Sequence, residues 1–222
     1  MNFAEKEVSI MFKKKDDSAK VIVLAIVFGV IAGGLTAFFV VDSKLSSEKT
    51  TEQLISEFYA VETAVHVSPH GLRKHMGEDD TYILVDLRSQ EEYEEEHITT
   101  AVNVPAYKDR DHSDYGAIDR IVSSFKALHA ENPDKDFIIY CYSTPCMTGR
   151  KIGKILADNG IYVKHLGVGW NEWRYDWTSF NHPHEWATTS SEQYISSGPE
   201  PGVLSEDLTG TGCPIGSDVL GC

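Results

Sequence analysis

A stretch of 21 residues without a charged side chain, Val21 to Val41, constrains this chain more than any other feature. As a helix it is long enough to cross the roughly 30 Å hydrocarbon core of a bilayer. A cleaved signal peptide usually has a shorter apolar region of roughly 7–15 residues, followed by a small-residue cleavage site. No clear site of that kind follows here. We therefore expect an uncleaved transmembrane helix over residues 21–41.

The charges beside this span predict its orientation. Four lysines precede it, whereas the charges that follow nearly cancel: Lys13, Lys14, Lys15 and Lys20 before, and Asp42, Lys44, Glu48 and Lys49 after. Positive flanks stay in the cytoplasm. We expect a single-pass protein with a cytoplasmic N-terminus (1–20), membrane lipid around the span, and the remaining residues outside. The net charge of −14 disfavours nucleic acid as a partner.

The chain after the span divides into three parts. Residues 42–65 are polar with apolar residues at helical spacing, which predicts a helical stalk. Residues 66–187 alternate short apolar strands with helices, which is typical of an α/β domain with a largely parallel sheet and helices on both faces. Residues 188–222 are rich in Ser, Gly and Thr, have no Lys or Arg, and include Cys213 and Cys222. We expect this last part to be a mostly irregular tail.

Cys141 directly follows the predicted strand Phe137–Tyr140 and precedes a helical segment. Active sites of parallel sheets lie outside the carboxyl ends of the strands. The backbone N–H groups and helix dipole expected there favour an anion, so the sequence predicts a partly exposed thiol of lowered pKa. The alternative is that Cys141 is one more small buried apolar residue. The polar residues that follow it favour a nucleophile.

Three segments together resemble the rhodanese-type sulfurtransferases. YILVDLRSQEEYEEEHITTAVNVP (82–105) is similar to the family pattern of Asp-x-Arg, Glu-Tyr, His-Ile and Ala-x-Asn-x-Pro. IIYCYS (138–143) resembles the strand and catalytic cysteine, and VKHLGVGWNEWRYDW (163–177) resembles the closing strand and tryptophan segment. The resemblance covers about half of the chain, and the three segments occur in the family's order. It implies a rhodanese-like fold.

The resemblance also implies a reaction. Cys141 would take a sulfane sulfur from a small donor as a persulfide and pass it to cyanide, a small thiol or a protein thiol, without a cofactor. Asp86 and Arg88 would be a structural pair at a strand end that holds the loop and the neighbouring helix, with Glu92 as a partner of Arg88. We also assign His97 and Asn103 to the architecture, because polar groups near strand ends usually satisfy the backbone.

The loop after Cys141 departs from the family. An arginine is usual about five residues after the cysteine, but that position is Cys146 or Met147 here. A phosphate dianion needs a bidentate cation there, so phosphatase activity is not expected. The uncharged loop also argues against thiosulfate as the donor. The candidate loop residues are Tyr142, Ser143, Thr144, Cys146, Met147, Thr148, Gly149 and Arg150.

Cys146 raises a second hypothesis. If its sulfur reaches Cys141, it can act as a resolving thiol, and the pair can cycle between dithiol and disulfide. The four cysteines lack the spacing of a zinc site, so no metal is expected. Three functions remain open: a sulfurtransferase, a thiol–disulfide redox or sensing module, and a non-catalytic rhodanese-like binding domain.

Overall fold

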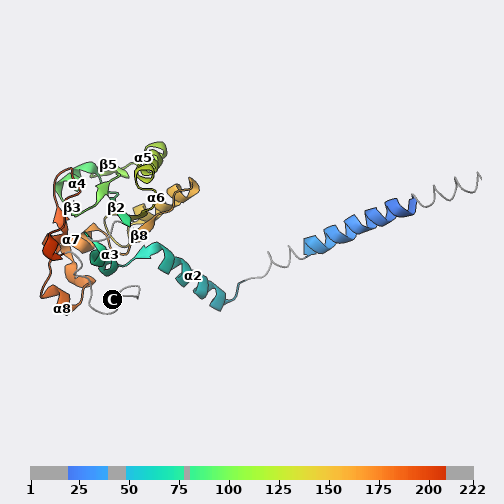
Figure 1. Ribbon diagram of the computed structural model, residues 1–222, viewed down its shortest axis with the longest axis horizontal. Helices are drawn as coiled ribbons and strands as arrows, with labels where there is room; N and C mark the ends of the chain where they lie inside the picture. The colour runs from blue at the N-terminus through green and yellow to red at the C-terminus, as the bar shows by residue number, and fades with distance from the viewer. Residues whose placement is uncertain (1–19, 40–48, 78–80, 209–222) are drawn as a thin grey trace, which may run out of the picture. The chain divides into compact units, whose positions relative to one another are not determined.

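The computed structural model describes residues 20–39, 49–77 and 81–208. Its centre is a parallel five-stranded sheet in the order β1-β8-β7-β2-β4. These strands are β1 (His66–Val67), β8 (Lys164–Leu166), β7 (Asp136–Tyr140), β2 (Tyr82–Asp86) and β4 (Val102–Asn103). Strand β7 lies in the middle, as expected for a strand that is buried on both faces. The predicted α/β fold is therefore confirmed (Figure 1).

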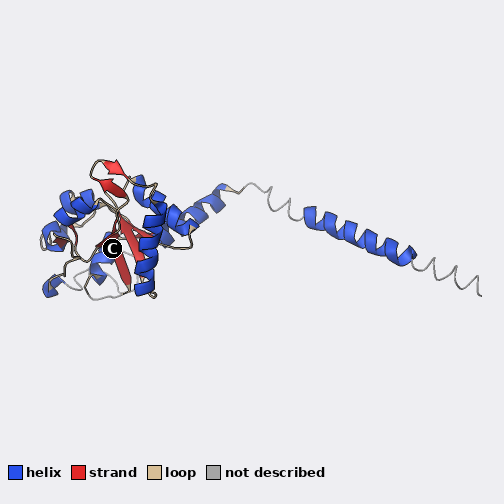
Figure 2. Cartoon of the chain, turned by 90° about the horizontal axis from the view of Figure 1, so that it is seen from above, coloured by secondary structure: helices blue, strands red, loops and turns tan. Residues whose placement is uncertain are grey.

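Helices cover both faces of the sheet, as Figure 2 shows. The side chains of β2 and β7 alternate between the two faces, so Val85 and Ile139 join one apolar cluster and Leu84 and Ile138 join the other. The first cluster also contains residues of α5 (Ile118–Glu131) and α6 (Met147–Asp158). The second contains residues of α3 (Pro69–His75), α4 (Gln90–Glu95) and α7 (Trp170–Tyr175).

Several short elements complete the domain. The strands β5 (Tyr107–Asp109) and β6 (His112–Ser113) form a hairpin, and β3 (His97–Ile98) pairs antiparallel with β9 (Ile195–Ser196). The remaining helical segments are η1 (Trp177–Ser179), α8 (Pro183–Trp186), η2 (Ser191–Tyr194) and η3 (Glu206–Leu208). The sequence analysis located the central strand at Phe137–Tyr140 but none of these short elements, because two or three residues carry no measurable periodicity.

Two helices precede the domain. The helix Lys20–Phe39 is apolar and long enough to cross a membrane, a property that a signal sequence near an N-terminus shares. Val40 and Val41, which the predicted span includes, lie outside the described residues, as do residues 1–19. The helix α2 (Thr51–Val65) occupies the predicted stalk and contains no buried residue.

Most of residues 188–208 are irregular in backbone structure, but the segment packs into the domain and does not form a tail apart from it. Tyr194 is fully buried in the cluster on the α7 side, together with Leu204 and Leu208. The backbone of this segment also bonds to the domain, because Thr99 N–H donates to Tyr194 O and Gly198 N–H donates to Glu94 O. The domain therefore continues to at least Leu208. Cys213 and Cys222 lie outside the described residues.

Candidate active site: a turn with two cysteines

Cys141 is the first residue after the central strand β7, as predicted. The turn that it begins is tied to the start of α7. Trp170 N–H donates to Cys141 O at 2.8 Å, and Asn171 N–H donates to Tyr142 O at 2.7 Å. The end of β7 and the N-terminus of α7 thus hold the backbone on the two sides of Cys141. Such a fixed backbone orients Cys141 without help from its own side chain.

The close approach between the turn and Gly169 explains a glycine at that position. A Cβ atom on residue 169 would lie 2.2 Å from the backbone nitrogen of Ser143. The carboxylate of Glu172 then joins the two segments, because it accepts from Gly169 N–H at 2.9 Å and from Thr144 N–H at 3.1 Å. Arg150 closes the turn from the other side by donating to Thr144 O and Cys146 O.

The turn brings the two thiols into contact. The Sγ atoms of Cys141 and Cys146 are 3.0 Å apart, so the geometric condition of the resolving-thiol hypothesis is met. Their surroundings differ, because Cys141 is 1% exposed and Cys146 is only half-buried. Burial, and hydrogen bonding to Cys146, raise the pKa of the Cys141 thiol well above its ordinary value. Burial also acts to raise the pKa of Cys146, but hydrogen bonds from Cys141, Thr148 and backbone N–H groups bring it below the ordinary value.

The prediction of a partly exposed Cys141 thiol with a lowered pKa is therefore wrong for the reduced pair. The helix α6 starts at Met147, with Cys146 at its N-cap position, so the helix end favours a negative charge at Cys146 and not at Cys141. Sequence reasoning assigned the lowered pKa and the greater exposure to Cys141, but in the structure Cys146 has both.

Sequence reasoning missed a cluster of three hydroxyl groups beside Cys146. The buried Thr148 Oγ1 lies 2.8 Å from Tyr107 Oη, 2.7 Å from Tyr115 Oη and 3.3 Å from Cys146 Sγ. Tyr107 is in β5 and Tyr115 follows the β5–β6 hairpin, so the hairpin brings both phenols to the start of α6. Burial raises the pKa of Tyr107, which keeps this phenol protonated and able to donate.

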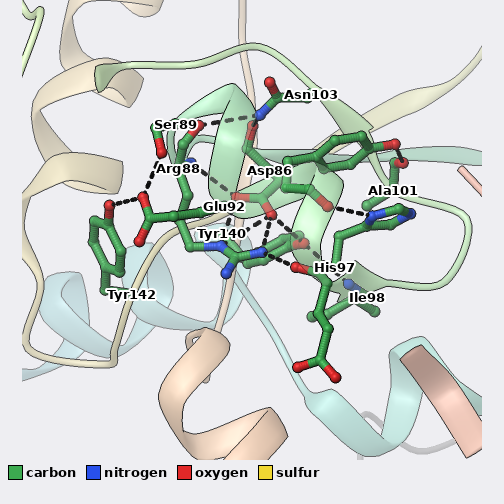
Figure 3. Close-up of polar contacts among 12 residues, drawn as sticks. Asp86, Arg88, Ser89, Glu92, His97, Ile98, Ala101, Asn103, Tyr140 and Tyr142 are labelled. Carbon is green, nitrogen blue, oxygen red and sulfur yellow. Dashed lines mark hydrogen bonds and ion pairs between the residues drawn. The ribbon is translucent and has the colours of Figure 1, made fainter. Parts of the chain in front are cut away.

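Contrary to the expectation from the sequence, Glu92 does not pair with Arg88. Its carboxylate accepts hydrogen bonds from the hydroxyl groups of Ser89 and Tyr142 (Figure 3). Ser89 is the N-cap residue of α4, but its side chain bonds to Glu92 and caps no backbone N–H. Burial, with the nearby Glu92 carboxylate, raises the pKa of Tyr142. Glu92 thus links α4 to the cysteine turn.

Asp86 and Arg88 form the buried ion pair that the resemblance implies. Arg88 Nη2 lies 2.6 Å from Asp86 Oδ2 and also donates to the carbonyl of Glu96 at 2.7 Å. Tyr140 Oη donates to the same Asp86 oxygen, and the Arg88 guanidinium stacks on Trp170. Asn103 donates to the carbonyls of Asp86 and Arg88 (Figure 3). This network satisfies charges and backbone at the strand ends.

The other candidate loop residues have separate roles. Met147, at the position of the family arginine, begins α6 and is 55% exposed. Gly149 packs against His165 of β8, where a Cβ atom would lie 2.1 Å from the imidazole Nε2. His97, also assigned to the architecture, bonds to Tyr93 O through Nδ1. Within residues 20–39, 49–77 and 81–208, no group of three or more His, Cys, Asp or Glu side chains could hold a metal ion.

Comparisons with known proteins agree with this geometry. The family model described as "Rhodanese-like domain" matches residues 68–176. The HTH-type transcriptional regulator Rv0324 of Mycobacterium tuberculosis is 32% identical over 91 residues, which are 41% of this chain. The chain spans about a third of the length of that relative, 34%.

Solved structures include two further matches. A full-length Lactobacillus plantarum protein is 15% identical, with a TM-score of 0.42, over 56% of this chain and 92% of the other. A structure described as rhodanese with anions from E. coli is 19% identical, with a TM-score of 0.28, over 41% of this chain and 89% of the other. The family match includes the strands β2, β4, β7 and β8 of the parallel sheet and the cysteine turn, so residues 68–176 of this chain form a rhodanese-like domain.

Proposed function

We propose that this domain is a sulfurtransferase that carries sulfane sulfur as a persulfide on Cys141. The observation that supports this most is the position of Cys141, at the carboxyl end of the central strand and before α6, in a rhodanese-like domain. The backbone bonds to Trp170 and Asn171 hold that position fixed. The donor is a small persulfide, and the acceptor is a thiol or cyanide.

The transfer needs no oxidant or reductant. In the loading half, a cysteine thiolate attacks the outer sulfur of a donor R–S–SH, the donor S–S bond breaks, and R–S⁻ leaves. In the unloading half, an acceptor thiolate attacks the outer sulfur of the enzyme persulfide, and the enzyme thiolate leaves. Two electrons stay with each departing sulfur, so the enzyme returns to its starting state.

A second candidate function is a thiol–disulfide module that senses or exchanges redox equivalents. The 3.0 Å contact between Cys141 and Cys146 favours it, because the two sulfurs need little movement to form a bond. The match to a protein named as a transcriptional regulator is compatible with sensing. A non-catalytic binding domain is the third candidate, which the retained cysteine pair disfavours.

Exchange of Cys141 for serine tests the enzyme proposal. We expect Cys141→Ser to lose sulfur transfer from a persulfide donor to a thiol acceptor down to the background rate. Circular dichroism should show a folded domain, with a stability loss of about 1 kcal/mol because a hydroxyl replaces a buried thiol. Transfer at the wild-type rate in this variant would contradict the proposal.

We also propose that the helix Lys20–Phe39 anchors the chain and that the domain lies outside the cytoplasm. The apolar length of the helix and the lysines before it support this topology. An impermeant thiol reagent applied to intact, reduced cells should label the protein. Labelling only after lysis would contradict the orientation, and release of the protein by a carbonate wash would contradict the anchor.

A further inference from the structure

We propose that Cys146, and not Cys141, is the thiol that first attacks an external persulfide, and that the hydroxyl groups of Thr148, Tyr107 and Tyr115 position it. This inference rests on the proposed function, because it assigns the order of the two thiols within that reaction. It reverses the order expected from the sequence, in which Cys141 was loaded first and Cys146 resolved it.

Access to solvent differs between the two sulfurs. Cys141 is 1% exposed, beneath a turn whose carbonyls are bonded to α7, and Cys146 is half-buried at the outer end of the same turn. Thiol exchange requires the attacking sulfur to lie in line with the S–S bond that breaks. The half-buried Cys146 is therefore more accessible to a donor than the fully buried Cys141. The first attack therefore belongs to Cys146.

Hydrogen bonds converge on the sulfur of Cys146. The Cys141 thiol lies 3.0 Å away and the Thr148 hydroxyl 3.3 Å away. Thr148 Oγ1 has one proton and two lone pairs. In the reduced pair the Cys146 S–H donates to Thr148 Oγ1. Once Cys146 is a thiolate, Tyr107 and Tyr115 can donate to both lone pairs of Thr148 Oγ1, and the Thr148 proton can turn to the sulfur.

The hydroxyl cluster can also form a hydrogen bond with the protonated thiol of Cys146. Tyr107 Oη and Tyr115 Oη lie 3.2 Å apart, so the three hydroxyl groups can instead donate around their own ring. Thr148 then accepts from the Cys146 S–H. Rotation of hydroxyl hydrogens is enough to change between the two patterns, and no heavy atom moves. The cluster therefore supports both the attacking thiolate and the thiol that leaves after transfer.

The proposed steps balance. The Cys146 thiolate attacks the outer sulfur of R–S–SH, a new S–S bond forms, the donor S–S bond breaks and R–S⁻ leaves. The two Sγ atoms, which are in contact in the reduced pair, separate to admit the outer sulfur of the Cys146 persulfide, and the sulfur of Cys141 attacks that outer sulfur in line with its bond to Cys146 Sγ. This gives a Cys141 persulfide, and the proton of the Cys141 thiol goes to the released Cys146 sulfur. Neither step changes the total oxidation state.

Competitive alkylation of the full-length, reduced protein tests the order. Limiting iodoacetamide at pH 7 is followed by fragmentation of the peptide that contains both cysteines. We expect Cys146 to be modified at least about tenfold faster than Cys141, since rate follows access and thiolate fraction. Equal rates, or faster modification of Cys141, would overturn the proposal. Because this measurement needs no variant, it does not depend on the folding of a mutant.

Variants test the path and the positioning residues. With glutathione persulfide, Cys141→Ser should trap the added sulfur on Cys146, and Cys146→Ser should load Cys141 at least about tenfold more slowly than wild type. Loading of Cys141 at the wild-type rate in Cys146→Ser would contradict the proposed path.

Thr148→Val should move the midpoint of the pH dependence of the Cys146 alkylation rate to higher pH, while the exposed Thr178→Val should leave it unchanged. If the midpoint of the pH dependence is the same in Thr148→Val as in wild type, Thr148 does not position Cys146.

The same experiments separate this inference from the proposed function. If Cys146 is alkylated first but wild type takes no sulfur from glutathione persulfide, the sulfurtransferase proposal fails and the order of thiol reactivity stands. If wild type is loaded and Cys141 is alkylated first, the sulfurtransferase proposal stands and the entry role of Cys146 fails.

Discussion

At the scale of single residues, buried charge distinguishes Asp86 and Arg88 from the many exposed ion pairs of this chain. Their side chains are 0% and 2% exposed. A charge in such a place must be paired, because solvent cannot screen it. The Asp-x-Arg spacing identified the pair from sequence, whereas the true partners of Glu92 depend on how α4 meets the cysteine turn.

Removing one charge of this pair should destabilise the folded domain strongly. Arg88→Met leaves Asp86 buried without its cation, and we expect the free energy of unfolding to fall by about 3–5 kcal/mol. Urea denaturation measures the loss. The matched control is Lys154→Met, which breaks an exposed pair with Asp158 and should change stability by no more than about 0.5 kcal/mol. Similar losses of stability in both variants would show that burial of the ion pair does not determine the loss.

His165 should make stability depend on pH. Burial, with repulsion from His66 and Arg150, lowers its pKa from 6.5 to about 4. The unfolded chain therefore binds more protons between these two values, so stability is full above pH 6.5 and is lost as pH falls toward 4. Between pH 7 and pH 5 the loss from this residue is about 2 kcal/mol. In His165→Gln the difference between urea unfolding at the two pH values should shrink by that amount, and an unchanged difference would contradict the pKa shift.

The residues of the site differ in how far sequence could reveal them. Cys141 and Cys146 lie five positions apart in one turn, so their contact could be expected from the loop alone. Tyr107 and Tyr115 are 41 and 33 positions from Thr148, and no periodicity or motif connects them. The low pKa was assigned to the wrong thiol because burial, which sequence does not report, outweighs the position at the end of a strand.

At the scale of elements, the contact between α6 and β8 fixes where the helix that follows the cysteine turn lies. Gly149 permits this contact, because its missing side chain leaves room for His165. The strand and helix themselves were predictable from an apolar run and from helical spacing. The distance between the strand and the helix was not predictable from the sequence, because it depends on which side chains face each other after folding.

Two glycines of α6 provide a matched comparison. Gly149→Ala places a methyl group against the His165 ring and should lower stability by about 1–3 kcal/mol. Gly153→Ala meets only Val163 Cγ2 at 3.8 Å, so it should raise stability by up to about 1 kcal/mol through helix propensity. Thermal unfolding of both variants checks the prediction. Equal effects of the two substitutions would contradict the close packing at Gly149.

At the scale of the whole molecule, the C-terminal segment belongs to the domain core. Composition suggested a tail because the segment is rich in Ser, Gly and Thr and has no Lys or Arg. Three apolar side chains, Tyr194, Leu204 and Leu208, nevertheless complete the cluster beneath α7. Average composition cannot show this, because a few well-placed side chains suffice when a domain already offers a partly formed core.

Truncating one of these side chains should show their contribution. Tyr194 is fully buried, so Tyr194→Ala should lower the free energy of unfolding by about 3 kcal/mol or more. Val203, in the same segment, is 92% exposed, and Val203→Ala should change stability by no more than about 0.5 kcal/mol. Denaturation of the full-length chain in detergent measures both. A small loss in Tyr194→Ala would mean that residues after 187 are not part of the stable domain.

The proposal that joins all three scales is sulfur transfer through the two-cysteine turn. Its most direct test is intact-protein mass spectrometry of the full-length chain after exposure to glutathione persulfide, with fragmentation to locate the change. We predict one added sulfur on Cys141 in wild type, removed when a thiol acceptor is added. A Cys141–Cys146 disulfide with no added sulfur, or thiols that remain unmodified, would contradict the account.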